Sequence, residues 1–230
     1  MAALLQPLHD RVRRAVVARG GAPGPVGDPV GRAEGPDPDR VLVLGSGPAS
    51  GLGAATQQDA LPGLLPRSLA ARTGRGAVVE VRGAQHARLA DVPELVAGAR
   101  LPRFDALILV VGMVDAASGA GVRRWSRALQ RQLDALQDDG ARDALILLTG
   151  VPPASSVTAR RPLGIPLADH RIRGINRRLQ DLARTRSSTA YVALPTPSPA
   201  EPVGGAAWYH RCAEAYAAAL APGLDAQHRV

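Results

Sequence analysis

The sequence contains no lysine, one cysteine and few aromatic residues, and each shortage excludes a class of site. All 28 basic residues are arginine, so the usual phosphate loop of nucleotide hydrolases, which ends in Gly-Lys-Ser or Gly-Lys-Thr, is excluded. Cys212 is the single cysteine, which excludes an intramolecular disulfide, and no Cys/His spacing of the zinc type occurs. We therefore expect neither a metal site nor a cofactor.

The scarcity of aromatic residues also bears on the net charge. The chain carries a formal charge of +8, but aromatics make up only 3% of it. Nucleic-acid-binding surfaces usually cluster basic residues on one face, often with stacking aromatic side chains among them. No basic run here is interleaved with aromatics. We therefore expect no nucleic-acid partner, and we attribute the charge to an arginine-rich compositional bias of the whole chain.

No apolar stretch approaches the length of a membrane span. Residues 1–19 show helical spacing of apolar residues with arginines around them. Pro7 and Asp10 interrupt the apolar run that a signal peptide would need. We expect a cytoplasmic protein whose residues 1–19 form an amphipathic helix. That helix either docks on the domain or makes weak contact with an anionic membrane surface.

The remaining chain divides by composition into a linker, one domain and a tail. Residues 20–39 are rich in Gly and Pro and almost empty of large apolar residues, as is typical of a linker. Residues 40–222 are long enough for one domain with a substantial core. Residues 223–230 are expected to form a short tail.

Short aliphatic runs alternate with helical patterns throughout the expected domain. Strands are expected over 41–45, 78–81, 106–111, 144–149 and 191–194, and helices over 61–72, 87–97, 122–138, 167–184 and 208–220. This alternation predicts an α/β fold, a doubly wound, five-stranded, mostly parallel sheet with helices on both faces. In such sheets the functional site lies beyond the carboxyl ends of the strands.

Residues 41–53, VLVLGSGPASGLG, combine an apolar strand with a glycine-rich turn. A dinucleotide-binding turn would need backbone amides and an acidic residue at the end of the second strand. Pro48 removes one amide, and Arg82 stands where the acid would be. A turn that presents a nucleophile, or a purely structural turn, remains.

Several blocks in order resemble one family. The chain is similar to the SGNH (GDSL-type) esterases and lipases, whose first strand ends in Gly-Asp-Ser. The matching blocks are 41–53, 59–75, 105–115 (DALILVVGMVD), Pro152 with Pro153, 171–184, and 207–220 (AWYHRCAEAYAAAL). The resemblance implies a three-layer α/β fold, hydrolysis of carboxylic esters without a cofactor, and a small acyl-ester or glycan-like ligand.

This chain departs from the family at most of the catalytic positions. Ser46 and Gly47 stand where the family has Asp and the nucleophilic Ser. Val114 replaces the Asn that helps to hold the oxyanion, and Ala207 replaces the Asp that orients the catalytic His. His210 alone matches that family motif.

The second oxyanion donor depends on how the second block is aligned. We favour an ungapped alignment from Thr73, which places it on His86, over a three-residue shift, which places it on Gly83. Gly112 and Asp115 of the third block are also expected in the cleft, where Asp115 could instead cap the following segment.

The replaced residues indicate impaired or atypical ester hydrolysis. Losing one oxyanion donor typically costs about 10²–10³ in rate, and losing the residue that orients the base costs about 10⁴. Ser46 is the best substitute nucleophile, with His210 as its base. Since side chains alternate along a strand, a one-residue offset could turn Ser46 away from His210. Three functions stay open: an atypical esterase, an inactive binding protein, and a membrane-surface or partner-binding protein that acts through residues 1–19.

Overall fold

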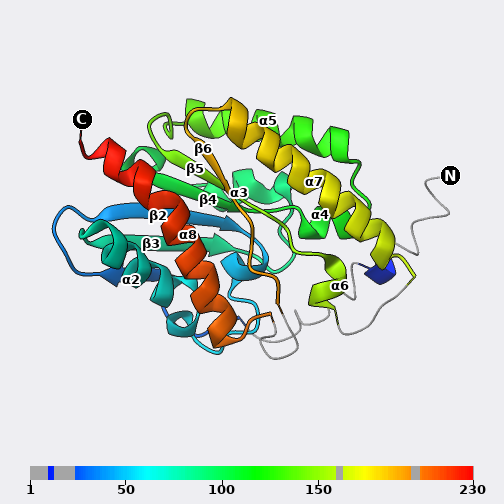
Figure 1. Ribbon diagram of the computed structural model, residues 1–230, viewed down its shortest axis with the longest axis horizontal. Coiled ribbons are helices and arrows are strands. Elements are labelled where there is room, and N and C mark those ends of the chain that lie inside the picture. The colour runs from blue at the N-terminus through cyan, green and yellow to red at the C-terminus, as the bar shows by residue number, and fades with distance from the viewer. Residues whose placement is uncertain (1–9, 13–23, 159–162, 198–202, 230) are drawn as a thin grey trace.

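A computed structural model describes residues 10–12, 24–158, 163–197 and 203–229. Six strands form one sheet in the order β1-β3-β2-β4-β5-β6 (Figure 1). Their bounds are β1 Val30–Ala33, β2 Asp39–Gly45, β3 Ala77–Gly83, β4 Ala106–Val110, β5 Leu145–Thr149 and β6 Thr189–Val192. All neighbouring pairs are parallel except β1 with β3. The expected α/β class and mostly parallel sheet are confirmed.

Strand β1 corrects the expectation that all of 20–39 is a linker and that the sheet has five strands. Val30 to Ala33 pair antiparallel with Glu80 to Ala77 of β3. An edge strand needs a neighbour's backbone hydrogen bonds more than large apolar side chains of its own. The Gly- and Pro-rich composition therefore did not reveal it.

The helices cover both faces of the sheet and bury two separate cores. Leu42 and Leu44 of β2 point toward α3 (Val92–Val96), α5 (Val122–Asp138) and α7 (Ile165–Thr185). Val41 and Val43 point the other way, toward α2 (Leu61–Thr73) and α8 (Ala206–Gln227). Figure 1 shows α2 beside α8, and α5 beside α7. The alternation of side chains along each strand explains why continuously apolar strands fit between two helical layers.

Shorter elements complete the described chain. They are α4 Met113–Ala117, α6 Ala154–Val157, and the 3₁₀ turns η2 Gly47–Ser50, η3 Gln57–Asp59, η4 Leu89–Asp91 and η5 Leu101–Arg103. The single helix expected over 87–97 is instead η4 followed by α3. Pro93 stands in the first turn of α3, where its missing N–H leaves no hydrogen bond unmade.

Helix α8 extends beyond the expected domain end and takes up most of the expected tail. It runs to Gln227 and includes Pro222. Leu224 is fully buried in the same core as Leu220, four residues earlier on the helix. Burial of that apolar face continues the helix past a proline that, by sequence alone, predicts its end.

Residues 10–12 are helical, and the rest of the expected N-terminal helix, residues 1–9 and 13–19, lies outside the described residues. Val12, one residue of its expected apolar face, is 2% exposed and packs in the core shared with α5 and α7. This burial favours docking on the domain over contact with a membrane. Within the described residues, no helix has the length and apolar character needed to cross a bilayer.

Candidate functional site

Strand β2 delivers Ser46 to the carboxyl edge of the sheet. The Ser46 backbone N–H donates to the Val110 carbonyl at 2.9 Å, which fixes the turn to the end of β4. Gly47 follows with φ +59°, in the left-handed region, and opens η2. The chain therefore turns sharply where the strand ends, with Ser46 only 4% exposed.

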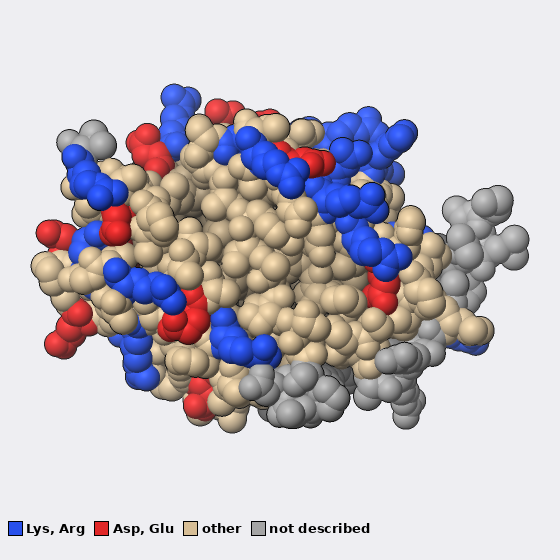
Figure 2. Space-filling model, in the orientation of Figure 1, with Lys and Arg blue, Asp and Glu red and all other residues tan. Residues whose placement is uncertain are grey.

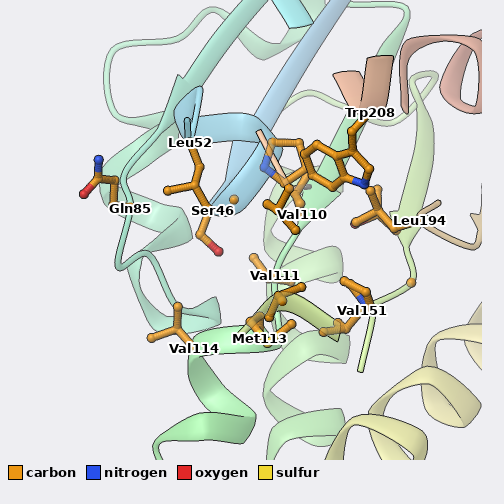
Figure 3. A pocket seen from close by; sticks show the side chains of 17 residues that line it. Ser46, Leu52, Gln85, Val110, Val111, Met113, Val114, Val151, Leu194 and Trp208 are labelled. Carbon is orange, nitrogen blue, oxygen red and sulfur yellow. The ribbon is translucent and has the colours of Figure 1, made fainter. Parts of the chain in front are cut away.

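A pocket of about 80 Å³ lies at this turn. Its wall comes from the ends of β4 and β5, from α4 and from the approach to α8, and it is mainly apolar (Figure 3). The apolar side chains that shape it include Val110, Met113, Val114, Val151, Val203 and Trp208. The expected position of the site, beyond the carboxyl ends of the strands, thus coincides with a real cavity.

Few polar side chains face this pocket, and two of them are already bonded. Thr149 Oγ1 donates to the Leu109 carbonyl at 2.9 Å, and Trp208 Nε1 donates to the Pro195 carbonyl at 2.9 Å. Figure 3 shows the Ser46 hydroxyl pointing into the open space, with Gln85 at its rim. Ser46 makes no side-chain cap bond to η2. Within the described part of the chain, no Asp, Glu, His, Cys or Arg lines the pocket.

The structure does not bring His210 to Ser46. His210 is exposed on α8 and does not line the pocket, whereas Trp208 does. Because α8 already begins at Ala206, Trp208, Tyr209 and Cys212 face the core and His210 points outward. Ala207 is exposed as well.

On the outer side of α8, the neighbour of His210 is an ion-pair cluster between helices. Glu214 accepts hydrogen bonds from Ser68 Oγ at 2.6 Å and Arg72 Nη2 at 2.8 Å. The Ser68 hydrogen bond, with that of Arg72, lowers the pKa of Glu214. This cluster joins α2 to α8 and does not belong to the pocket.

The residues of the third block separate onto two sides of α4. Val114 is 4% exposed and lines the pocket. Gly112 precedes α4 as its N-cap and does not line the pocket. The Asp115 carboxylate turns away and accepts the Leu89 N–H at 3.2 Å. Burial raises the pKa of Asp115. Asp115 therefore caps η4, a different segment from the one expected.

The second block places neither candidate donor on the pocket wall. Gly83 pairs with Gly45 at the end of β2, and an added Cβ at Gly83 would lie 1.9 Å from the Ala49 carbonyl oxygen. His86 is exposed. Gln85, between the two, lines the pocket. Gly83 thus packs directly against the turn that carries Ser46, which favours the shifted alignment.

Sequence reasoning did not single out Gln85, Val203 or Trp208. Apolar residues at the edge of a sheet form no recognisable motif, so nothing in the sequence indicates that Val203 lines the pocket. Trp208 could have been noticed, since it is one of two tryptophans and stands at the start of the expected last helix. No group of His, Cys, Asp or Glu among the described residues could hold a metal ion.

Comparison with solved structures identifies the fold. The lipase Lip_vut3 from a goat rumen metagenome superposes with a TM-score of 0.64 at 12% identity, over 78% of this chain and 96% of that one. A protein described as lipolytic, of the G-D-S-L family, from Desulfitobacterium hafniense gives 0.58 at 12% identity, over 78% and 98%. A family two carbohydrate esterase from Cellvibrio japonicus gives 0.58 at 14%, over 84% of this chain and 63% of that one.

These similarities confirm the resemblance for the fold. Because the sequence identities are this low, they show nothing beyond the fold. No protein-family model matches the sequence, and no curated protein matches it either. The molecule therefore combines an ester-hydrolase-like scaffold with an edge pocket whose chemistry has to be read from its own residues.

Proposed function

We propose, from the SGNH (GDSL-type) hydrolase fold of this chain, that the protein binds a small apolar ligand such as a short acyl group beside Ser46 without hydrolysing it. One observation carries this proposal: the Ser46 hydroxyl faces a pocket to which no described residue brings a base. A serine hydroxyl is a weak nucleophile unless an adjacent base takes its proton. Hydrolysis of the family's type also needs donors aimed at the oxyanion, and Val114 offers none.

The pocket wall matches a short apolar group in size and character. Its volume of about 80 Å³ is below the ~150 Å³ of an apolar cavity that admits benzene. Apolar walls with one or two polar groups are typical of small-ligand sites, where the polar groups fix orientation. The Ser46 hydroxyl could orient a carbonyl oxygen, while the valines enclose the apolar chain of the ligand. Mostly apolar walls suit an acyl group better than a glycan.

The first experiment separates binding from hydrolysis. Purified protein is incubated with short-chain nitrophenyl esters and, separately, with a serine-reactive phosphonate. We expect hydrolysis equal to the buffer rate and no label on Ser46. Turnover that disappears in both Ser46→Ala and His210→Ala would instead establish an atypical esterase and overturn the proposal.

The second experiment tests the pocket directly by calorimetric titration with methyl acetate. Val114→Phe should fill the cavity and abolish measurable binding. Val26→Phe is the matched control, because Val26 is 76% exposed and does not line the pocket, and it should leave binding unchanged. Equal affinity in the two variants, or no binding to the unmodified protein, would contradict a ligand site at Ser46.

A further inference from the structure

A second hollow lies on the other side of α4, between η4, the loop 118–121 and α5. Its volume is about 560 Å³. Three arginines line it, Arg88 from the start of η4 and Arg124 and Arg131 from α5. We call it the arginine hollow. It shares no lining residue with the pocket at Ser46, so it is a separate feature of the fold.

The start of α5 adds backbone donors at the rim of the arginine hollow. Gly121 is the N-cap of α5 and offers no side-chain cap, and the first turn contains no acidic residue. The first backbone bond of the helix runs from Trp125 N to the Gly121 carbonyl at 2.9 Å. Among the described residues, therefore, nothing pairs with the preceding amides or offsets the positive end of the helix dipole. Ser118 of the same loop contributes a hydroxyl to the lining.

Negative charge is scarce in this hollow. Its single acidic side chain is Asp115, which is 8% exposed and already accepts the Leu89 N–H. Arg88 has a loose ion pair with Asp91 at 3.8 Å. No ion pair of Arg124 or Arg131 occurs within the described part of the chain.

Trp125 also lines the hollow and is 4% exposed. Its indole Nε1 lies beside the Asp115 carboxylate, an acceptor within the wall itself. The donors left to a ligand are those of the arginines, of Ser118 and of the start of α5.

We propose that the arginine hollow binds a small molecule through a phosphate group. Guanidinium groups match phosphate oxygens in a planar, two-pronged geometry, and the amides at a helix N-terminus supply further donors. The volume accommodates a phosphate together with a substantial organic part. This site goes beyond ligand binding at Ser46 and does not depend on it.

Arginines on the outer faces of the helices do not make a comparable site. Figure 2 shows them gathered over α5 and α7, whereas the surface between α7 and α8 carries few charged side chains. Several of these outer arginines pair with carboxylates, as Arg184 does with Asp181 and Arg186 with Asp134. Convex, solvated helix faces of this kind are expected in any arginine-rich protein, whereas a hollow that concentrates three arginines is not.

Calorimetric titration of the full chain with sodium pyrophosphate at fixed ionic strength tests the proposal. The double variant Arg124→Gln, Arg131→Gln should weaken binding at least about tenfold, because two charge-assisted contacts are lost. Arg127→Gln is the matched control, since Arg127 lies on α5 but does not line the hollow, and it should bind as the unmodified protein does. Thermal melts verify that all variants fold, as expected for exposed positions.

A vesicle arm separates a soluble phosphate ligand from a lipid headgroup. The same proteins are sedimented with vesicles of phosphatidic acid in phosphatidylcholine. Binding of pyrophosphate that requires Arg124 and Arg131, without such vesicle binding, identifies a soluble ligand. Vesicle binding that requires the same two arginines identifies a headgroup. If neither kind of binding depends on these arginines more than on Arg127, the proposal is wrong.

Discussion

The two edges of the sheet handle polar groups in opposite ways. At the amino edge, Asp39 begins β2 fully buried and accepts hydrogen bonds from the Arg75 guanidinium at 3.0–3.2 Å. Arg75 also reaches Asp225 of α8 at 2.9 Å. At the carboxyl edge, the Ser46 hydroxyl faces valines and has neither a base beside it nor a hydrogen-bond partner within the described chain.

The contrast shows where this chain keeps buried charge. A buried ion pair with satisfied hydrogen bonds fixes how elements meet, here β2, the end of α2 and α8. A catalytic site would need similarly buried and hydrogen-bonded polar groups beside its nucleophile. The carboxyl edge has apolar side chains beside Ser46 instead. The buried ion pair thus holds the amino edge together, whereas no charged side chain of the described residues lines the pocket at the carboxyl edge.

The largest effect is expected from breaking the amino edge. Asp39→Ala leaves the Arg75 guanidinium, 14% exposed, without its main partner and should lower the free energy of unfolding by about 3 kcal/mol. Asp225→Ala removes a partner that is 39% exposed and should cost less than about 1 kcal/mol. Urea denaturation measures both. Equal losses would mean that burial of the pair does not distinguish this edge.

At the carboxyl edge, the two glycines should differ in their sensitivity. Gly83→Ala drives a methyl group against the Ala49 carbonyl and should cost about 2–3 kcal/mol. Gly47→Ala meets no atom within 4 Å, so its cost, about 1 kcal/mol, reflects only the left-handed backbone. Denaturation curves of the two variants test this order. A larger loss for Gly47→Ala would contradict the close packing of Gly83 against the Ser46 turn.

The pH dependence of stability tests the one buried carboxylate near the carboxyl edge. Because burial raises the pKa of Asp115 above the ordinary value of 3.8 that the carboxyl has in the unfolded chain, the folded state binds a proton that the unfolded state lacks in the pH window just above that value. The contribution of Asp115 to stability should therefore fall as the pH rises through its folded-state pKa. Asp115→Asn cannot titrate. We therefore expect the free energy of unfolding of the unmodified protein, relative to that of the variant, to be lower at pH 7 than at pH 4. A difference that stays constant with pH would argue against a raised pKa.

The smallest effect is expected at Ser46 itself. Its hydroxyl bonds to no described residue, so Ser46→Ala should change stability by less than about 0.5 kcal/mol. Thr149→Val, at the same pocket, removes the bond to the Leu109 carbonyl and should cost about 1 kcal/mol. Thermal or urea unfolding compares them. A clear loss in Ser46→Ala would reveal a structural partner for the hydroxyl.

Much of the scaffold could be predicted from local pattern. All five expected strands lie within two residues of their observed ends. Continuous aliphatic runs specify strands buried on both faces wherever the chain places them. Strand β1 and the end of α8 were missed because backbone pairing with β3 and burial of Leu224 come from distant parts of the chain.

The site was predicted less completely. Ser46 and Val114 do line one pocket, because Ser46 directly follows β2 and Val114 lies in α4 shortly after β4, and these two strands end at the same edge of the sheet. His210 does not line the pocket, and the residues around it in the sequence do not indicate that its side chain points to solvent. The start of α8 at Ala206 decides which residues face the pocket, and a shift of two residues on a helix turns a side chain to the opposite face.

By itself the sequence determined the parallel sheet, its two helical layers and which residues stand where the resemblance predicts catalytic groups, because these follow from periodicity and residue identity. Only the tertiary structure decided that Ser46 faces an apolar pocket, that His210 points to solvent, and that Arg88 meets Arg124 and Arg131 around one hollow. The physical reason is that the direction of a side chain depends on where each helix begins and on what it packs against. That packing comes from segments far apart in the chain.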